Sequence, residues 1–334
     1  MKILAIETSC DDTSVAVVED GKHVVYMKTV SQHNAHKLFG GIVPEIASRK
    51  HLDVIYDLTR EVLQSLDTNI ENSLKQVGAI AVTFTPGLTG SLLVGLNFAK
   101  GICLANNIAL VGVHHLKAHV AANYIDNKGI KPPFLCLLVS GGHTCIVKAE
   151  NYIKFRVIGK TRDDAVGEVF DKITRISDIP DCLNIDMMAK DIHEENKEIK
   201  FTIPKLENFD FSFSGMKTQA INYIKSKKKA GEVAFNLRHT VFKYLTEKLL
   251  EAAKKNNCNK VAISGGVASN LYLREMILKE CRKNKIDFYA PEPKYCTDNA
   301  AMIGVQGYFE FINGNISQLD LNAYDSKSEI AKMF

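Results

Sequence analysis

Short runs and alternations of hydrophobic residues near the start of the chain are typical of β-strands. Residues 2–30 read KILAIETSCDDTSVAVVEDGKHVVYMKTV, which predicts a strand, a polar turn at 8–13, a second strand, a hairpin turn at 20–21 and a third strand. Residues 134–159 read FLCLLVSGGHTCIVKAENYIKFRVIG, and they predict the same order of elements with a small-residue turn at 140–144. The repeated pattern indicates two related halves.

Helical periodicity lies between these two regions and again after residue 160. Apolar spacing predicts a helix over 44–66, a strand over 78–84, a Gly-rich turn over 85–90 and a helix over 91–107. The later chain is mostly helical, with a strand, turn and helix at 260–281 and a strand near 288–290. A last helix is expected to begin within 296–304, with Asp298 in its first turn. Strands that alternate with helices predict an α/β fold.

Length and composition fit a globular protein of two domains. The chain has 334 residues, of which 46% are hydrophobic and 24% charged. We expect an N-terminal half over 1–130 and a C-terminal half over 131–334, with a helical insertion around 160–257. As an alternative, the C-terminal helix packs back onto the first half.

Cysteine usage and hydropathy indicate a cytoplasmic protein with no membrane association. The eight cysteines are scattered without a C-x-x-C pair, which suits a reducing compartment. No apolar run approaches the length of a transmembrane helix, and the start of the chain does not resemble a secretory leader.

The net charge is only +4, so composition alone does not indicate a nucleic-acid-binding protein. A local basic cluster is formed by Lys225, Lys227, Lys228 and Lys229. A solvated helix end is the favoured interpretation of this cluster, and a contact with an RNA backbone is the alternative.

Residues 113–119, VHHLKAH, are a candidate metal site. In a helix, His115 and His119 stand four apart on one face, where two imidazoles can bind one ion, while His114 points elsewhere. Asp298 is a candidate for the third ligand. A zinc protease of the H-E-x-x-H type needs a glutamate where this chain has Leu116. Partly buried histidines without a metal remain the alternative.

Three small or acidic turns outline a nucleotide-binding cleft. The segments ETSCDDTS, VSGGHT and SGGVASN can offer backbone N–H groups and hydroxyls to phosphate. Asp11 and Asp12 are paired acids in the first turn, and an ordinary Asx turn explains them equally well. Asp171 in DDAVGEVFDK could accept from ribose hydroxyls, although a solvated helix face is favoured on these residues alone.

Taken together, the motifs resemble those of the tRNA threonylcarbamoyladenosine biosynthesis protein TsaD family, in its bacterial and mitochondrial branch. The matching segments follow the family's order over nearly the whole chain: IETSCDDTSVAV, GGIVPEIASRKH, TPGLTGSLLVGL, GVHHLKAH, LLVSGGHT, DDAVGEVFDK, DFSFSGMKT, GGVASNLYLR and CTDNAAMIG. The resemblance implies the ASKHA (actin/hexokinase-like) fold, in which two duplicated RNase H-like halves enclose a cleft.

The resemblance also implies a reaction. The threonylcarbamoyl group passes from threonylcarbamoyl-adenylate to the exocyclic N6 amine of the adenosine 3′ of the anticodon, in tRNAs that read ANN codons, and AMP leaves. The implied metal ligands are His115, His119 and Asp298, which hold one divalent ion per subunit, Fe²⁺ first and Zn²⁺ or Mg²⁺ as alternatives. Asp11 and Asp12 correspond to the catalytic acids. The implied substrate-binding residues are Leu138, Val139, Ser140, Gly141, Gly142, Asp171, Cys182, Asp186 and Asn270.

The resemblance also implies partner molecules, and the chain differs from the family pattern at a few positions. It implies tRNA, a TsaB-like paralogue and a TsaE-like ATPase as partners. The chain departs from the family pattern at Lys117, where an acid is usual, at Asp12, where glutamate is commoner, and at 178–186, where Asp181 and Cys182 replace glycines. The altered loop favours one alternative, a nucleotide-binding, non-catalytic partner subunit of the same complex. A metalloprotease is a less favoured alternative.

Overall fold

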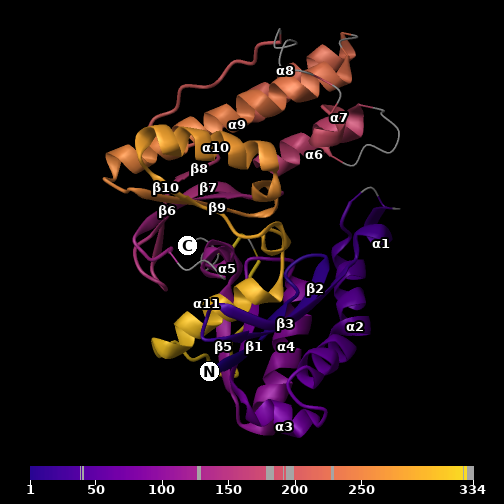
Figure 1. Cartoon of the computed structure of the whole chain (residues 1–334). Coiled ribbons are helices and arrows are strands. Elements are labelled where there is room, and N and C mark those ends of the chain that lie inside the picture. Colours follow the sequence, from indigo (N-terminus) through magenta and orange to yellow (C-terminus); the bar gives the residue numbers. More distant parts are fainter. Residues whose placement is uncertain are drawn as a thin grey trace. The chain divides into compact units, whose positions relative to one another are not determined.

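Two five-stranded sheets with the same strand order organise the chain (Figure 1). A computed structural model describes residues 1–37, 39, 41–125, 129–177, 184–190, 192, 199–226, 229–325 and 327–328. The first sheet has the order β3-β2-β1-β4-β5. Its strands are β1 Lys2–Glu7, β2 Asp12–Glu19, β3 His23–Ser31, β4 Val77–Thr85 and β5 Ala109–His114.

The second sheet repeats this arrangement in the order β8-β7-β6-β9-β10. Its strands are β6 Phe134–Val139, β7 Thr144–Ala149, β8 Phe155–Lys160, β9 Lys260–Ser264 and β10 Asp287–Tyr289. In both sheets the first strand along the chain pairs antiparallel with the second and parallel with the fourth. The predicted pair of hairpin-led halves and the α/β class are therefore confirmed.

The helices that accompany the first sheet are α1 His33–Lys37, α2 Pro44–Gln64, α3 Ile70–Lys75, α4 Thr89–Asn106, α5 His115–Ala121, η1 Ala122–Tyr124, η4 Pro293–Tyr295 and α11 Ala300–Ile312. The sequence predicted both bounds for only two of them, α2 and α4, and they begin and end close to the predicted positions. Pro44 occupies the first helical position of α2, where its missing N–H leaves no helix hydrogen bond unmade. The predicted helices over 44–66 and 91–107 are thus confirmed.

The core of the first unit lies on both faces of the first sheet. Leu4 and Ile6 of β1 share a hydrophobic cluster with Ile55 of α2 and Leu96 of α4. On the other face α11 contacts β1, β2, β4 and β5. Gly307 of α11 makes this close approach feasible, because a Cβ there would lie 2.4 Å from the Cβ of Ala81.

The segment after residue 160 is largely helical, as expected. Its helices are α6 Val166–Ile176, α7 Ile185–Met188, α8 Ser214–Lys225, α9 Ala230–Lys255, η3 Gly266–Ser269 and α10 Leu271–Asn284. One strand, β5, was not among the predicted elements. Its apolar run is short, and periodicity alone does not separate such a run from the end of the preceding helix.

Contacts divide the chain into two compact units. The first contains the described residues of Met1–Pro132, Glu150–Phe155 and Pro291–Phe334, and the second contains those of Pro133–Ala149 and Arg156–Ala290. The last segment thus belongs to the first unit, whereas the predicted halves placed it nominally in the second. The division of the chain into halves over 1–130 and 131–334 stays a prediction. No helix among the described residues is long and apolar enough to cross a membrane.

Candidate metal centre and flanking turns

Helix α5 carries two buried histidines on one face, as the spacing predicted. The His115 and His119 rings lie edge to face with their centroids 4.6 Å apart. Their side chains are 9% and 2% exposed. His114 caps the helix instead, and its Nδ1 accepts from the Leu116 N–H at 3.2 Å. The interpretation of His114 as pointing elsewhere is confirmed.

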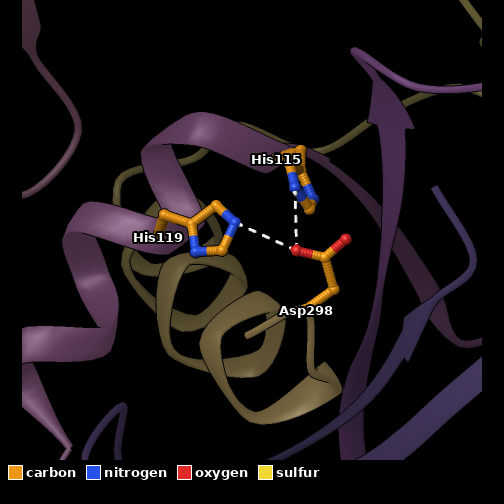
Figure 2. Close-up of side chains that lie close together, drawn as sticks. All are labelled: His115, His119 and Asp298. Carbon is orange, nitrogen blue, oxygen red and sulfur yellow. Dashed lines mark hydrogen bonds and ion pairs between the residues drawn. The ribbon is translucent and has the colours of Figure 1, made fainter. Parts of the chain in front are cut away.

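Asp298 reaches the two histidines from a segment far along the chain (Figure 2). Its Oδ1 lies 3.4 Å from Nε2 of His115 and 3.1 Å from Nε2 of His119. The prediction that Asp298 lies in the first turn of the last helix is wrong, because α11 begins at Ala300. Asn299 is the N-cap and accepts from the Met302 N–H, so Asp298 precedes the helix and its side chain turns toward α5.

These three side chains form a group suited to a metal ion. One ligand atom from each lies within 4.8 Å of the others, and the described residues contain no other such group of three or more histidine, cysteine, aspartate or glutamate side chains. Two imidazole nitrogens and one carboxylate oxygen are donors that Fe²⁺ and Zn²⁺ accept, whereas Mg²⁺ prefers oxygen ligands. The donor set therefore fits a transition metal.

Strong electrostatic coupling holds the group together. Burial acts to lower the pKa of His115, but the carboxylates of Asp298 and Glu7 raise it to about 10. Burial acts to raise the pKa of Asp298, but the charge of His115 and hydrogen bonds from both histidines bring it well below 3.8. Burial lowers the pKa of His119. Opposite charges on His115 and Asp298 thus stabilise each other, with the histidines buried and Asp298 partly exposed.

Glu7, which the sequence analysis did not single out, lies directly behind His115. It is fully buried at the end of β1, and its Oε2 is 3.1 Å from Nδ1 of His115. Burial acts to raise the pKa of Glu7, but the charge and hydrogen bond of His115 lower it overall. Glu7 is an acid at the end of an otherwise apolar, buried strand, and this feature of the sequence could have identified it.

The acids of the first turn lie at the start of β2. Asp12 is half-buried, and its Oδ1 has no hydrogen-bond partner in the part of the chain that the structure describes. Burial raises the pKa of Asp12 to about 6, and the negative charges of Asp11, Asp298 and Glu7 act in the same direction. Asp12 is therefore a carboxyl group that titrates close to neutral pH.

A buried histidine of α2 fixes the shape of this turn. His51 lies with Nδ1 2.7 Å from the Thr13 hydroxyl and Nε2 3.0 Å from the Cys10 carbonyl oxygen. Because a carbonyl oxygen only accepts, Nε2 carries the proton, and burial lowers the pKa of His51. The two hydrogen bonds hold the chain on either side of Asp11 and Asp12.

The turn between β6 and β7 has a different character. Leu138 and Val139 are buried in β6, whereas Gly141 and Gly142 are exposed and face open space. The Ser140 N–H donates to the His143 carbonyl at 2.8 Å and closes the turn. The predicted segment 138–142 thus ends a buried strand and presents bare backbone to solvent.

Two of the remaining predicted residues meet in the second unit. Asp186 of α7 accepts from Arg238 Nη1 at 2.6 Å and from the side-chain amide of Asn270. Asn270 also caps α10 by accepting from the Leu273 N–H at 3.2 Å. Arg238 was not predicted, and the contact joins residues 52 positions apart that carry no shared motif.

Two predicted residues do not join this cluster. Asp171 is exposed on α6, and no hydrogen bond links it to Asp186 or Asn270 within the described segments. Cys182 lies outside the described residues, as do the other residues of 178–183 in the altered loop.

The fold and this site define the class of the protein. Two duplicated sheets of this order are found in ASKHA-type proteins, and the crystal structure of T. kodakarensis HypF superimposes with a TM-score of 0.63 at 12% identity, over 96% of this chain and 49% of that chain. At this identity the likeness concerns the fold alone.

Sequence comparison identifies the family. The family model described as TsaD, tRNA N6-adenosine threonylcarbamoyltransferase, matches residues 23–305. The proteins of that name from Clostridium kluyveri and Clostridium perfringens are 46% and 45% identical to this chain, over 97% and 96% of it and 96% of each relative. The chain belongs to the tRNA N6-adenosine threonylcarbamoyltransferase family. The predicted family and fold are confirmed.

Proposed function

We propose that this chain transfers a threonylcarbamoyl group from threonylcarbamoyl-adenylate to N6 of the adenosine 3′ of the anticodon, in tRNAs that read ANN codons. The observation that carries the proposal is the 46% identity with a named transferase over 97% of the chain. A C–N bond forms between N6 and the carbamoyl carbon. The bond from that carbon to the phosphate oxygen breaks, AMP leaves with the electron pair, and N6 loses one proton.

The proposed metal ligands are His115, His119 and Asp298, with one divalent ion per subunit. Fe²⁺ is the first candidate, since two histidines and one carboxylate are a common donor set for it, and Zn²⁺ is the second. When bound, the ion supplies Lewis acidity that favours charge developing on the carbamoyl and phosphate oxygens. The partly exposed Asp298 and the buried histidines would hold it at the surface of the first unit.

Asp11 and Asp12 are the proposed proton acceptors. A neutral adenine amine is a poor nucleophile, so a carboxylate within hydrogen-bond reach of N6 assists by taking its proton as the new bond forms. Asp12 has the better-matched acidity, because burial raises its pKa to about 6. Its buried Oδ1 has no hydrogen-bond partner among the described residues.

The proposed adenylate contacts come from the second unit. Exposed backbone at Gly141 and Gly142 can donate N–H groups to the phosphate, and Asp171 can accept from ribose hydroxyls. Asp186 and Asn270 are proposed to bind the nucleoside. Cys182 stays in this set on the family resemblance alone.

The proposed setting is a cytoplasmic complex with tRNA, a TsaB-like paralogue and a TsaE-like ATPase. With a net charge of only +4, the chain supplies few phosphate contacts of its own, so tRNA binding shared among subunits is expected. Lys225 and Lys229, at the end of α8 and the start of α9, are candidates for such contacts.

The test is a transfer assay with the purified chain, its partner proteins, threonylcarbamoyl-adenylate and unmodified tRNA, read by mass spectrometry of the nucleoside. Modified adenosine that depends on this chain supports the proposal. A folded, metal-loaded chain that binds the adenylate but yields no product overturns it in favour of a non-catalytic subunit. Peptidase activity that disappears in His115→Ala would instead support the protease alternative, which lacks an acid at Leu116.

A further inference from the structure

A buried carboxylate stands behind only one of the two histidines. Glu7 is 0% exposed, and no lysine or arginine pairs with it in the described part of the chain. An ionised carboxyl in such a place is costly unless hydrogen bonds compensate for lost water. Apolar packing alone therefore does not explain why an acid occupies position 7.

Three donors surround this carboxylate. One oxygen, Oε1, accepts from the Ser9 backbone N–H, and the other, Oε2, accepts from the Thr83 hydroxyl at 2.6 Å. The same Oε2 lies 3.1 Å from Nδ1 of His115. Glu7 is thus fixed from both β1 and β4, so its position relative to α5 is set by the sheet.

Nδ1 of His115 faces this carboxylate oxygen and also the Ser9 hydroxyl at 3.2 Å, and its contact with the carboxylate determines which ring nitrogen is free. An ionised carboxylate only accepts, so Nδ1 must carry a proton and donate it to Glu7. The lone pair of a neutral ring is then on Nε2, which faces Asp298 Oδ1 at 3.4 Å. Nε2 is the atom that a metal at the candidate site would need.

We propose that Glu7 is a positioning residue that holds His115 in the Nδ1–H tautomer and aims Nε2 at the metal. Metal-bound histidines usually donate their other N–H to such a partner, which raises the basicity of the ligand. Glu7 and Asp298 together also carry two negative charges, which match a divalent ion in a buried setting. The inference rests on the proposed metal site.

His119 provides an internal contrast. Its Nδ1 is buried and has no hydrogen-bond partner among the residues the structure describes. The orientation of His119 is therefore left to packing and to its 3.1 Å contact with Asp298. Loss of Glu7 should accordingly weaken the metal through His115 alone.

The test measures Zn²⁺ and Fe²⁺ dissociation constants of the full chain by chelator competition, the Fe²⁺ series without oxygen. In Glu7→Gln the amide must direct its NH₂ at Ser9, Thr83 or His115, and donation to Nδ1 of His115 would place the proton on Nε2. We expect metal affinity to fall by roughly 10–100-fold. His115→Ala is the positive control and should lose the metal.

Glu310→Gln is the matched control. Glu310 is also a buried carboxylate of the first unit, hydrogen-bonded to Gln306 and Asn315 on or near α11, and it does not touch either histidine. It forms a 3.9 Å ion pair with Lys117 of α5. We expect it to lower the thermal stability of the metal-free protein with less than about a threefold change in metal affinity.

The outcomes separate the two proposals. Wild-type affinity in Glu7→Gln, combined with loss of metal in His115→Ala, overturns the role of Glu7 and leaves the metal site intact. Wild-type affinity in His115→Ala overturns the metal site and this inference with it.

A measurement on the wild-type chain keeps the proposal falsifiable if Glu7→Gln does not fold. Histidine-selective ¹⁵N spectra, assigned by comparison with His115→Ala, report the tautomer of His115 with Zn²⁺ bound. A protonated Nδ1 and a metal-bound Nε2 are expected. The opposite tautomer contradicts the proposal.

Discussion

The two sheets share one strand order, yet the turns that follow their first strands carry opposite chemistry. After β1, the turn at 8–11 is flanked by the acids Glu7, Asp11 and Asp12, and it lies near the histidine pair. After β6, the turn at 140–143 contains Ser140, Gly141 and Gly142, with no acidic side chain. The same topological position is therefore acidic in the first sheet and without acidic side chains in the second.

The fold determines where each turn lies, and the side chains determine its chemistry. In both sheets the antiparallel hairpin and the parallel fourth strand bring the turn to the carboxyl end of the first strand. The turn after β1 lies beside the candidate metal ligand His115, with Ser9 Oγ 3.2 Å from its Nδ1. The turn after β6 instead presents exposed glycine backbone, a kind of surface that suits phosphate. The proposed division of ion and adenylate follows from this contrast, and substitutions on each side can test it.

The largest effect is expected from removing a histidine ligand. His115→Ala should abolish metal binding and lower transfer by more than the roughly 10–100-fold that loss of an outer partner costs. His114→Ala is the control, because His114 caps α5 and does not belong to the candidate metal group, and its loss should cost about 1 kcal/mol of stability. Metal content and single-turnover transfer measure both. Equal transfer in the two variants would contradict a metal role for His115.

Adding a side chain at a tightly packed glycine of the second unit should lower its stability. Gly265 has φ +90°, and a Cβ there would lie 2.3 Å from the Val139 carbonyl oxygen at the end of β6. Gly265→Ala should therefore cost at least about 1–3 kcal/mol in the free energy of unfolding. Denaturant unfolding measures this, and an unchanged midpoint would show that the strand end tolerates displacement.

Gly142 is the matched position without that constraint. A Cβ added there meets nothing within 4 Å, so Gly142→Ala should change stability by less than about 0.5 kcal/mol. If the turn binds the adenylate phosphate, the added methyl group should still weaken adenylate affinity, by about 3–10-fold, corresponding to about 0.7–1.4 kcal/mol. Calorimetry with a non-hydrolysable adenylate checks this. Unchanged affinity would remove the turn from the proposed site.

A moderate pH effect is expected from Asp12. Its pKa is raised by burial from 3.8 to about 6, so the fraction that can accept a proton should increase as pH rises through about 6, and transfer with it. The sign for stability is opposite. The folded state holds this proton more tightly than the unfolded state, so the wild type should lose stability relative to Asp12→Asn between pH 4 and 6. Matching pH profiles for wild type and Asp12→Asn would exclude Asp12.

The smallest effect is expected at Lys117, although its charge lies between the two histidines in sequence. Its Nζ is 3.9 Å from Glu310 and 3.4 Å from the Ile153 carbonyl oxygen, so it is directed away from the ligand atoms. Lys117→Ala should change stability by about 0–1 kcal/mol and metal affinity by less than about threefold. A larger loss of metal would mean that the departure from the family's usual acid affects the ion.

Local pattern was sufficient for both hairpins, for the longer helices and for the histidine pair, but not for β5. The hairpins, α2 and α5 follow from alternation, from Pro44 and from the four-residue spacing of His115 and His119. Each depends on residues close together in the chain, which is what periodicity reports.

Contacts between residues far apart in the chain could not be predicted from the sequence pattern alone. Asp298 meets His119 across 179 positions; the residues alone offered Asp298 as a candidate ligand, and the family resemblance then implied the full set of three. Glu7 and Arg238 were missed because each acts through a distant partner, His115 in one case and Asp186 in the other. The start of α11 was misplaced since Asp298 and Asn299 are both good N-caps, and only the backbone distinguishes them.

The most direct measurement is single-turnover transfer to unmodified tRNA, with partner proteins present, as the metal-free chain is titrated with Fe²⁺ without oxygen. Mass spectrometry of the modified nucleoside gives product, and metal analysis gives the ions bound. Product should rise in proportion to bound ion and level off at one ion per chain, with no such rise in His115→Ala. Full transfer by the metal-free chain, or none at full occupancy, would contradict a metal-dependent transferase.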